Sequence, residues 1–531
     1  MIKKVIIHNY KTFKDFDLEL SNDCNIIVGD NETGKSTIVE SINLALKKQL
    51  NGKFIESELS PYLFNSIVVK DFLAEIAAGK NPALPEIYIE LYFDEVSEMA
   101  TFRGTNNSLH EDSIGIRLDI AFDKDFQEEY EKLLEDRSQI KLIPVEYYKV
   151  SWRSFADHAL SYRSIPVGVS FIDATTIRLQ SGTDYYLQNI ISDGLEVKER
   201  VALSIAYRKL REEFAGQGSI VAINQKLDAG KGGITDKQLA IAIDISQKAN
   251  WETNLIPHLD NLPFHLSGKG EQNSLKIMLA LDRKADVTNI ILIEEPENHL
   301  SFSSMNLLLK KIKDKCDGKQ LIITTHSSFV LNKLGLDKLI LIRGGLKARL
   351  DSLPTSTQDY FKKLSGYDTL RLILSKKAVL VEGPSDELMV QRAYLNKHGK
   401  LPIEAGIDVI NVRGLSFKRF LDIAKALNIN ASVVTDNDGD FESKIEKKYV
   451  DYSAFSNIQI FYDKDNTAST LEPQIVKCND LGVLNGILGT AFTDKSSLTA
   501  YMIDNKTESA LALFETEQLF KIPQYIQDAI T

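Results

Sequence analysis

The chain has 531 residues, of which 43% are hydrophobic and 26% are charged, and its formal net charge at pH 7 is -11. This composition is typical of globular proteins, and it excludes a largely disordered chain, a collagen-like chain and a disulfide-stapled scaffold. The acidic balance argues against binding to nucleic acid through bulk positive charge, so contacts with DNA have to come from local basic clusters or from bound metal.

The cysteine content and the apolar runs indicate the compartment. Cys24, Cys316 and Cys478 are far apart, which is typical of a reducing compartment and of a protein without a cysteine metal site. The N-terminal apolar run ends at Asn9 and is too short for the core of a signal peptide. No segment approaches the roughly 18 consecutive apolar residues that cross a bilayer. We therefore expect a cytoplasmic protein with no membrane partner.

Apolar periodicity predicts the elements in chain order. Strands are expected at residues 5–7, 16–20 and 25–28, and the spacing of Ile38, Ile42 and Leu46 predicts a helix over residues 35–47. Strand patterns follow at residues 86–93, 114–122 and 142–150, and helical character dominates residues 185–256. Further strands are expected at residues 290–293 and 321–323, and a second α/β unit opens with a strand at residues 378–381.

Residues 29–36 contain the P-loop pattern, with four residues between its glycines, a predicted strand before it and a helix after it. The glycines let the backbone amides face phosphates, the lysine reaches the β and γ phosphates, and the serine ligates Mg²⁺. A glycine-containing turn without a ligand is the alternative. The predicted ATP-binding residues of this segment are Gly29, Asn31, Gly34, Lys35, Ser36 and Thr37.

Two glutamates follow the apolar strand at residues 290–293, where the acidic residue of a P-loop ATPase belongs. Glu294 is expected to hold the Mg²⁺ water shell, and Glu295 to activate the attacking water. An aspartate is more usual at the first of these positions. A solvated strand end is the alternative interpretation.

Two later segments indicate the type of ATPase. Residues 266–272, which contain Ser267, precede an apolar helix and resemble the signature motif of ABC-type ATPases. His326 follows the strand at residues 321–323 and resembles their switch histidine, a sensor of the γ phosphate, although a structural histidine is the alternative. Because the signature motif acts across a dimer interface in those ATPases, the resemblance implies at least a homodimer.

A second set of acidic residues lies in the C-terminal part. Glu382 ends an apolar strand and Asp386 follows in a turn that enters a helix, and Asp436, Asp438 and Asp440 follow the strand at residues 431–435. Carboxylates at the ends of parallel strands meet at one edge of a sheet. Such hard oxygen ligands suit Mg²⁺ or Mn²⁺, and two ions there would hydrolyse a phosphodiester.

This pair of motifs resembles the TOPRIM domain of topoisomerases, primases and nucleases. Glu472 is a further candidate metal ligand and Lys506 a candidate catalytic cation, although each could equally be a solvated residue. Three basic residues after the strand at residues 408–412 are candidates for DNA-phosphate contacts, with a solvated loop as the alternative: Arg413, Lys418 and Arg419.

The ABC-type ATPase motifs followed by the TOPRIM motifs resemble the OLD (overcoming lysogenization defect) family of nucleases, and the resemblance covers almost the whole chain. The resemblance implies a metal-dependent DNA endonuclease that forms dimers or tetramers. One group of the family, which includes the nuclease subunit of the Gabija anti-phage system, is encoded beside a UvrD-like helicase. The resemblance implies these catalytic residues in the nuclease: Glu382, Asp386, Asp436, Asp438, Glu472 and Lys506. In the ATPase it implies Glu295. The implied metal ligands of the nuclease are its five catalytic carboxylates together with Asp440, and Ser36 is the implied ligand of the ion that accompanies the nucleotide.

We therefore expect an α/β chain: an ABC-type P-loop ATPase domain with a helical insertion, followed by a C-terminal TOPRIM domain. The expected parts are the first ATPase segment (1–184), a helical insertion for dimerisation (185–256), the second ATPase segment (257–350), a linker (351–375) and the TOPRIM nuclease domain (376–531). The helical insertion could equally cover the sheet.

The expected activity is ATP-binding, Mg²⁺- or Mn²⁺-dependent DNA cleavage in anti-phage defence. The main alternative is a RecF-like DNA-repair ATPase whose TOPRIM domain serves only for docking. A primase or a topoisomerase is the weaker alternative. The chain has no zinc-ribbon cysteines for a primase, and its nineteen tyrosines neither support nor exclude the nucleophile of a topoisomerase. The form of the signature motif departs from the common ABC sequence, which leaves the rate of ATP hydrolysis open.

Overall fold

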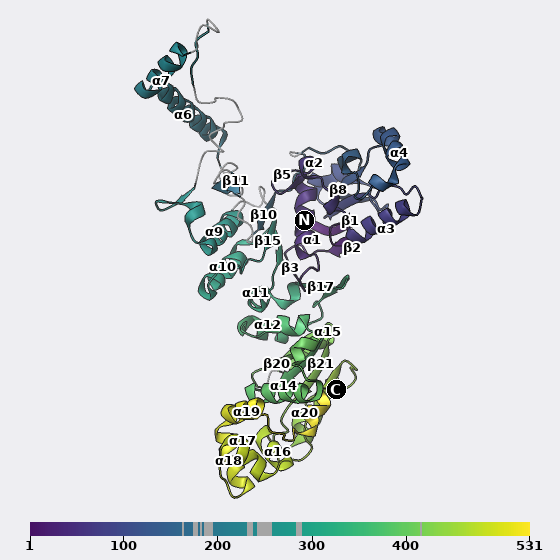
Figure 1. The fold of residues 1–531 in the computed structure, drawn as a ribbon, viewed down its shortest axis with the longest axis vertical. Coiled ribbons are helices and arrows are strands. Elements are labelled where there is room, and N and C mark those ends of the chain that lie inside the picture. The colour runs from purple at the N-terminus through teal and green to yellow at the C-terminus, as the bar shows by residue number, and fades with distance from the viewer. Residues whose placement is uncertain are drawn as a thin grey trace. The chain divides into compact units, whose positions relative to one another are not determined.

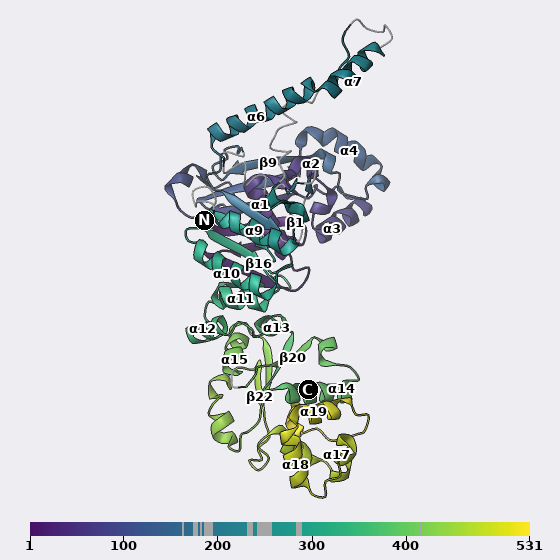
Figure 2. The same cartoon turned by 90° about the vertical axis from the view of Figure 1, so that its left-hand side faces the viewer.

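The computed structural model describes residues 1–161, 164–173, 179–180, 183–184, 195–230, 237–241, 257–282, 289–414 and 417–530. The chain divides into two compact units (Figures 1 and 2): residues 1–23 with 36–323, and residues 24–35 with 324–531. The predicted boundaries at residues 184, 256, 350 and 375 remain predictions. None of the described helices is both long and apolar enough to cross a membrane.

An antiparallel sheet forms the N-terminal part of the first unit. Val5 of the first strand faces Leu18 on one side and Leu91 on the other, and all three side chains are buried. The strand order is β2-β1-β6-β8-β7, and β9 also pairs with β8. The strands are β1 (Ile2–Tyr10), β2 (Phe13–Glu19), β6 (Ile87–Phe93), β7 (Arg103–Gly104), β8 (Ser113–Phe122) and β9 (Tyr148–Ser154).

The strand predicted at residues 142–150 is wrong at both ends. Pro144 lacks an N–H group to donate to a neighbouring strand, and a 3-10 turn over Val145–Tyr147 follows it. The strand β9 therefore begins at Tyr148, opposite Phe122, and continues to Ser154. Its Trp152 donates a hydrogen bond of 2.8 Å from Nε1 to the carbonyl of Ala45 in the first long helix.

A second, mostly parallel sheet carries the predicted nucleotide motifs. Its central strands are continuously apolar, as expected for a parallel sheet covered on both faces, and Ile290 to Ile293 are fully buried. The order is β10-β15-β16-β3-β17-β18. The strands are β10 (Val169–Asp173), β15 (Ile290–Glu294), β16 (Gln320–Thr324), β3 (Cys24–Gly29), β17 (Leu339–Arg343) and β18 (Leu346–Arg349).

Helices and short hairpins accompany the two sheets. The predicted helix over residues 35–47 is confirmed as α1 (Lys35–Lys47), and the other helices are α2 (Ile55–Glu58), α3 (Ser66–Ala77), α4 (Gln127–Glu135), α9 (Lys269–Asp282), α10 (Phe302–Lys315) and α11 (Ser328–Leu334). Two-residue strands form β4 (Gln49–Leu50) with β5 (Lys53–Phe54), β11 (Leu179–Gln180) with β12 (Thr183–Asp184), and β13 (His258–Leu259) with β14 (Leu262–Pro263).

The predicted helical insertion is described in part. It contains α6 (Val197–Gly216) and α7 (Gly218–Ala229), which confirms helical character for these residues. Residues 185–194, 231–236 and 242–256 of the predicted insertion lie outside the described residues. The α6 helix carries large apolar side chains that are exposed: Val197, Val201, Leu203, Ile205, Leu210 and Phe214.

The C-terminal part has a four-stranded parallel sheet in the order β20-β19-β21-β22. Because side chains alternate along a strand, Ala378 and Leu380 of β19 belong to one hydrophobic core, and Val379 and Val381 to the other. The strands are β19 (Lys377–Val381), β20 (Ile407–Asn411), β21 (Asn430–Val434) and β22 (Ile458–Phe461).

Nine helices are described in this part of the second unit. The segment expected to be a linker contains α12 (Thr355–Lys363) and α13 (Thr369–Leu374), and its Phe361 and Leu372 are fully buried. The helices that follow are α14 (Pro384–His398), α15 (Phe417–Ala426), α16 (Leu471–Cys478), α17 (Leu481–Leu488), α18 (Lys495–Asp504), α19 (Lys506–Glu515) and α20 (Gln524–Ala529).

Candidate functional site

The P-loop connects β3 to α1 and requires glycine at two positions. A Cβ atom at Gly29 would lie 2.4 Å from the carbonyl oxygen of Ile342, a distance that real Cβ atoms do not reach. Gly34 has a φ of +93°, a conformation that favours glycine. The loop backbone is therefore held in the tight turn that a phosphate-binding loop needs.

Lys35 lies folded onto this loop. Its side chain is buried, and its Nζ donates hydrogen bonds to the carbonyl oxygens of Gly29 (3.0 Å) and Asp30 (2.8 Å). Ser36 is exposed in the first turn of α1, Thr37 is buried beside it, and Asn31 is exposed on the loop. The ammonium group is thus positioned at the loop, where phosphate oxygens could replace the carbonyls as its partners.

Glu294 and Glu295 end β15 in different conformations. Glu294 is the buried last residue of the strand, whereas Glu295 has a φ of +46°, in the left-handed region. Asn298 fixes Glu295 twice, through its side-chain amide to Oε2 (2.7 Å) and through its backbone N–H to the carbonyl (3.0 Å). Non-glycine residues in this conformation are uncommon and cluster at functional sites.

The predicted signature segment precedes α9. The Oγ of Ser267 donates a hydrogen bond to the carbonyl of Phe264 (2.7 Å), and Gln272 donates to the carbonyl of Ser267 (2.9 Å). A Cβ atom at Gly270 would lie 2.2 Å from the carbonyl oxygen of His299. The first turn of α9 therefore packs directly on the loop after Glu295, a contact that sequence reasoning missed.

His326 is exposed directly after β16. The residue before it, Thr325, is buried and accepts a hydrogen bond from the N–H of Ser327 (3.0 Å). Ser327 in turn caps α11 by accepting from the N–H of Val330 (3.3 Å). The P-loop thus follows β3, the two glutamates lie at the end of β15, and His326 follows β16.

The carboxylate site begins where β19 and β21 end. The Oε1 of Glu382 accepts hydrogen bonds from the hydroxyl of Thr435 and from the N–H of Asp436 (3.2 Å). These bonds connect the end of one strand to the end of its neighbour. Thr435 was missed from the sequence, although it lies directly before the predicted acidic run.

Asp386 lies in the first turn of α14 and faces this group. Its Oδ2 accepts a hydrogen bond from the N–H of Gly383 (3.1 Å), which caps the helix. Burial, followed by the charges of Glu382 and Glu472, raises the pKa of Asp386 to about 7. The carboxyl group therefore holds a proton far more readily than an exposed aspartate does.

Asp436 is the most perturbed carboxyl group of the site. Burial, followed by the charges of Asp386, Glu382 and Glu472, raises the pKa of Asp436 to about 9, while Lys506 opposes the shift. The Oδ1 of Asp436 is buried and has no hydrogen-bond partner within the described part of the chain. Four carboxylates from three segments of the chain thus lie near one another here, at the cost of mutual repulsion.

Glu472 and Lys506 complete the group. Glu472, in the first turn of α16, is buried and accepts a hydrogen bond from the hydroxyl of Thr470 (3.1 Å). Lys506, at the start of α19, is half exposed, and its Nζ lies 3.6 Å from the Oε2 of Glu472. The structure therefore brings both predicted residues to the site as an ion pair.

Asp438 and Asp440 are exposed, whereas Asp436, the remaining carboxylate of the acidic run, is partly buried. Asp438 has a φ of +50°, and its N–H donates to the carbonyl of Ser469 (3.2 Å). The Oδ1 of Asp440 accepts a hydrogen bond from the N–H of Ser443 (3.1 Å), and this bond lowers the pKa of Asp440. Asp440 thus caps the turn that follows it.

Asn437 lies between these aspartates and is fully buried. Its amide donates to the carbonyls of Asp463 (2.8 Å) and Asp465 (3.0 Å), and its oxygen accepts from the N–H of Gly439 (2.9 Å). The side chain therefore holds the loop after β21 against the loop after β22. The sequence contained a sign of this role, because asparagine in such a run favours local turns.

The predicted DNA-contacting residues differ in their partners. Arg419 donates hydrogen bonds to the hydroxyls of Ser356 (2.7 Å) and Thr357 (2.8 Å) of α12. The guanidinium of Arg413 lies 5.7 Å from the centre of the Tyr367 ring. Arg419 therefore has a structural role that its sequence position did not reveal.

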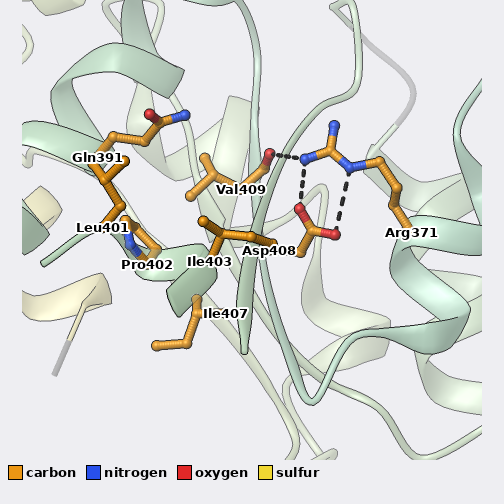
Figure 3. Close-up of a pocket in the computed structure, with 8 residues that line it drawn as sticks. All are labelled: Arg371, Gln391, Leu401, Pro402, Ile403, Ile407, Asp408 and Val409. Carbon is orange, nitrogen blue, oxygen red and sulfur yellow. Dashed lines mark hydrogen bonds and ion pairs between the residues drawn. The ribbon is translucent and has the colours of Figure 1, made fainter. Parts of the chain in front are cut away.

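A cavity of about 230 Å³ lies at the other end of β20, where Ile407 pairs with Lys377 at the start of β19 (Figure 3). Arg371 binds Asp408 (2.5 Å) and the carbonyl of Val409 (3.0 Å) on its wall. The other lining residues are Gln391, Leu401, Pro402, Ile403 and Ile407. Arg371 and Asp408 thus pair with each other on the cavity wall. The cavity is separate from the carboxylate site.

The carboxylate oxygens of this site are suitable ligands for a hard divalent cation. Carboxylate oxygens are the preferred ligands of Mg²⁺ and Mn²⁺, and positive charge would relieve the repulsion around the unpaired oxygen of Asp436. Among the described residues, no three carboxylate, imidazole or thiol groups already form a metal-binding cluster. The side chains would therefore have to draw together around an ion.

Comparisons with known proteins agree with the two sets of motifs. The AAA ATPase domain family matches residues 1–331, and the overcoming lysogenization defect protein-like TOPRIM domain matches residues 373–438. Together they confirm the predicted fold class, an α/β P-loop ATPase domain followed by a TOPRIM domain.

Individual relatives are distant. The chain is 22% identical to the endonuclease GajA of Bacillus cereus (strain HuB5-5) over 91% of this chain and 82% of the relative. It is 20% identical to the retron Vc95 probable ATPase of Vibrio cholerae serotype O1 biovar El Tor, over 75% of this chain and 83% of the relative. The solved C-terminal region of the Burkholderia pseudomallei OLD protein matches 30% of this chain and 96% of its own, with 18% identity and a TM-score of 0.23.

Proposed function

This chain belongs to the AAA ATPase domain family and continues into an OLD-like TOPRIM domain, and on this premise we propose that it is an ATP-binding, divalent-metal-dependent DNA endonuclease. The observation that carries the proposal is the group of carboxylates at the ends of β19 and β21, of which Asp386 and Glu472 are buried and Glu382 and Asp436 are partly buried. Asp386 and Asp436 have pKa values raised to about 7 and about 9, and perturbed carboxyl groups of this kind mark functional sites.

Each side chain has a role in the proposed reaction. Glu382, Asp386, Asp436, Asp438 and Glu472 would hold Mg²⁺ or Mn²⁺ through their oxygens, with Asp440 as an outer ligand. When bound, two such ions would supply an activated water and neutralise the leaving oxygen of a phosphodiester. The raised pKa of Asp436 favours its protonated form, so we expect ion binding to be coupled to release of a proton from the site.

Lys506 is the cation of the site. Its Nζ lies 3.6 Å from Glu472 while half of its side chain is exposed, so it can face a DNA phosphate without leaving the carboxylates. A positive charge held there would stabilise the negative charge that develops on the phosphate during cleavage.

The N-terminal domain binds ATP in this proposal. Lys35 and Ser36 would hold the phosphates and their Mg²⁺, and Glu295 would activate water. The restrained, left-handed Glu295 supports this role, because Asn298 holds its carboxylate in one orientation. Ser267 and His326 would act on the γ phosphate, with Ser267 contributed by a second copy.

The biological setting is part of the proposal. The match to the endonuclease GajA and the sequence resemblance to the OLD family support a role in anti-phage defence on DNA, with a UvrD-like helicase as a partner. The exposed apolar side chains of α6 support assembly of dimers or tetramers through the helical insertion.

The test is cleavage of supercoiled plasmid with Mg²⁺ or Mn²⁺, with and without ATP. We expect Asp438→Ala to lose at least about 100-fold in rate, the scale of removing a catalytic group, and Lys35→Ala to change only the response to ATP. Asp480→Ala, an exposed aspartate at the start of α17, is the matched control and should cleave normally. No cleavage in either metal by a protein that binds ATP would contradict the proposal and favour the docking-module alternative.

A further inference from the structure

Tyr525, at the start of α20, is a buried phenol beside the carboxylate site. Its side chain is only 6% exposed, and its hydroxyl has no hydrogen-bond partner among the described residues. The ring packs in the hydrophobic core that contains Val381 and Val434, the last residues of β19 and β21. The helix α20 packs against α14 and β21, which are labelled in Figure 1, and against β22, and these elements carry or precede the site.

The hydroxyl lies within the electrostatic field of the carboxylates. Burial, followed by the charges of Asp436 and Asp386, raises the pKa of Tyr525 well above its ordinary value. Of these charges, that of Asp436 has the largest effect on the pKa of Tyr525. The Oδ1 of Asp436 is itself buried and has no hydrogen-bond partner in the described structure. A hydroxyl donor and a carboxylate acceptor, both desolvated and both unsatisfied, therefore lie on neighbouring elements.

Unsatisfied buried polar groups are costly and rare in folded proteins, so each one needs an explanation. Deep burial excludes Tyr525 as a nucleophile, because a DNA phosphate cannot reach its hydroxyl. Metal-ligating carboxylates are commonly held by a hydrogen bond from a residue behind them, and that bond sets the orientation of the ligand.

We propose that Tyr525 is a positioning residue that donates a hydrogen bond to the carboxylate of Asp436 when a divalent cation is bound. The bond satisfies both groups and directs the other carboxylate oxygen toward the ion. This inference rests on the proposed metal-dependent function and adds to it a residue, from the far C-terminal helix, that no motif contains.

The experiment compares Mn²⁺ binding by wild-type protein and Tyr525→Phe in full-length form, measured by calorimetry without DNA or nucleotide. Loss of an outer hydrogen bond typically weakens metal affinity by about 10–100-fold, and we expect a loss in that range. Thermal unfolding in EDTA should be unchanged or slightly raised in the variant, because it loses only an unsatisfied hydroxyl. The shift in melting temperature on adding Mn²⁺ should shrink.

The control is Tyr394→Phe. Tyr394 lies in the same hydrophobic core, but its ring contacts His398 in a tilted arrangement with 4.2 Å between ring centres, and loss of its hydroxyl should leave Mn²⁺ affinity unchanged. In the double variant Asp436→Asn/Tyr525→Phe, the second change should add no further loss, because Tyr525 acts through Asp436. Wild-type Mn²⁺ affinity in Tyr525→Phe would overturn the inference, whereas no Mn²⁺ binding by the wild-type protein would overturn the proposed function instead.

Discussion

Single residues of the carboxylate site carry an electrostatic cost that the metal-free protein does not relieve. Asp386 and Asp436 lie beside Glu382 and Glu472 in a buried environment, with Lys506 as the opposing charge. Desolvation and like charges both disfavour the ionised form. This cost supports the proposed role of these side chains in binding a cation.

The raised pKa of Asp436 predicts a pH dependence of stability. Its pKa is 3.8 when unperturbed and about 9 in the folded protein, so the folded state keeps a proton that the unfolded chain has lost between these values. The stabilising contribution of Asp436 to the free energy of unfolding is therefore complete below about pH 4, and it decreases as the pH rises toward 9. Asp436→Asn should remove this dependence.

The measurement is thermal unfolding in EDTA from pH 4 to pH 9. At pH 8 we expect Asp436→Asn to melt at least about 4 °C above the wild-type protein, on a scale of roughly 2–4 °C per kcal/mol for units of this size. At pH 4 the difference should vanish, and Asp480→Asn should behave as the wild type throughout. If the melting temperatures of Asp436→Asn and of the wild type changed in parallel with pH, Asp436 would not be desolvated beside the other carboxylates.

At the scale of elements, the C-terminal sheet positions the site through its strand order. β19 lies between β20 and β21, so Glu382 and Asp436 follow adjacent parallel strands. The loop after β21 then needs its own support, which Asn437 provides through hydrogen bonds to the loop after β22. The orientation of Asp436 and Asp438 therefore depends on the buried amide between them.

Asn437→Ala should weaken both the fold and the site. The change leaves the partly buried carbonyls of Asp463 and Asp465 without their donor, which should lower the free energy of unfolding by about 1–3 kcal/mol. Mn²⁺ affinity should fall as well, because Asp436 and Asp438 lose their fixed orientation. Urea denaturation and calorimetry measure the two effects.

Asn466→Ala is the matched control for this change. Asn466 is exposed on the facing loop and accepts a hydrogen bond of 3.2 Å from the N–H of Phe441. Its removal should cost no more than about 0.5 kcal/mol, as for most surface changes. Equal stability of Asn437→Ala and Asn466→Ala would mean that the amide does not support the loop.

At the scale of the whole molecule, the proposed activity depends on assembly. The signature segment acts across a dimer interface in the ATPases that it resembles, and α6 has an apolar surface that a partner could cover. Leu203, Leu210 and Phe214 are spaced with Tyr207 at intervals of three and four residues, so they share one face of the helix. All three apolar side chains are exposed.

The double variant Leu210→Glu/Phe214→Glu should dissociate the proposed dimer or tetramer, because charges on this face cannot be buried against a partner. Light scattering after gel filtration should show a fall in mass, and ATP hydrolysis should fall with it. Lys209→Glu changes charge on the same helix beside the apolar face and should preserve the assembly. An unchanged mass for the double variant, or a monomeric wild-type protein, would contradict assembly through α6.

Local sequence patterns were sufficient to predict the positions of several helices and strands. The helix at residues 35–47 and the strands that end at Gly29, Glu294 and Val381 lie close to where apolar periodicity and turn residues place them. The strand at residues 142–150 was misplaced because its apolar residues matched the strand pattern, while Pro144 and pairing with β8 decided where the strand begins. Strand boundaries depend on partners far away in the chain.

By itself, the amino-acid sequence determined the fold class and indicated an ATPase joined to a nuclease, because glycine spacing and acidic residues at strand ends are short-range properties. Only the tertiary structure decided that the partly buried Asp436 lies near the buried Asp386 and Glu472, that Asp440 caps a turn, and that Tyr525 packs in the core that contains Val381 and Val434. Burial and repulsion arise where segments from residue 382 to residue 525 meet, and no local pattern along the chain encodes that meeting.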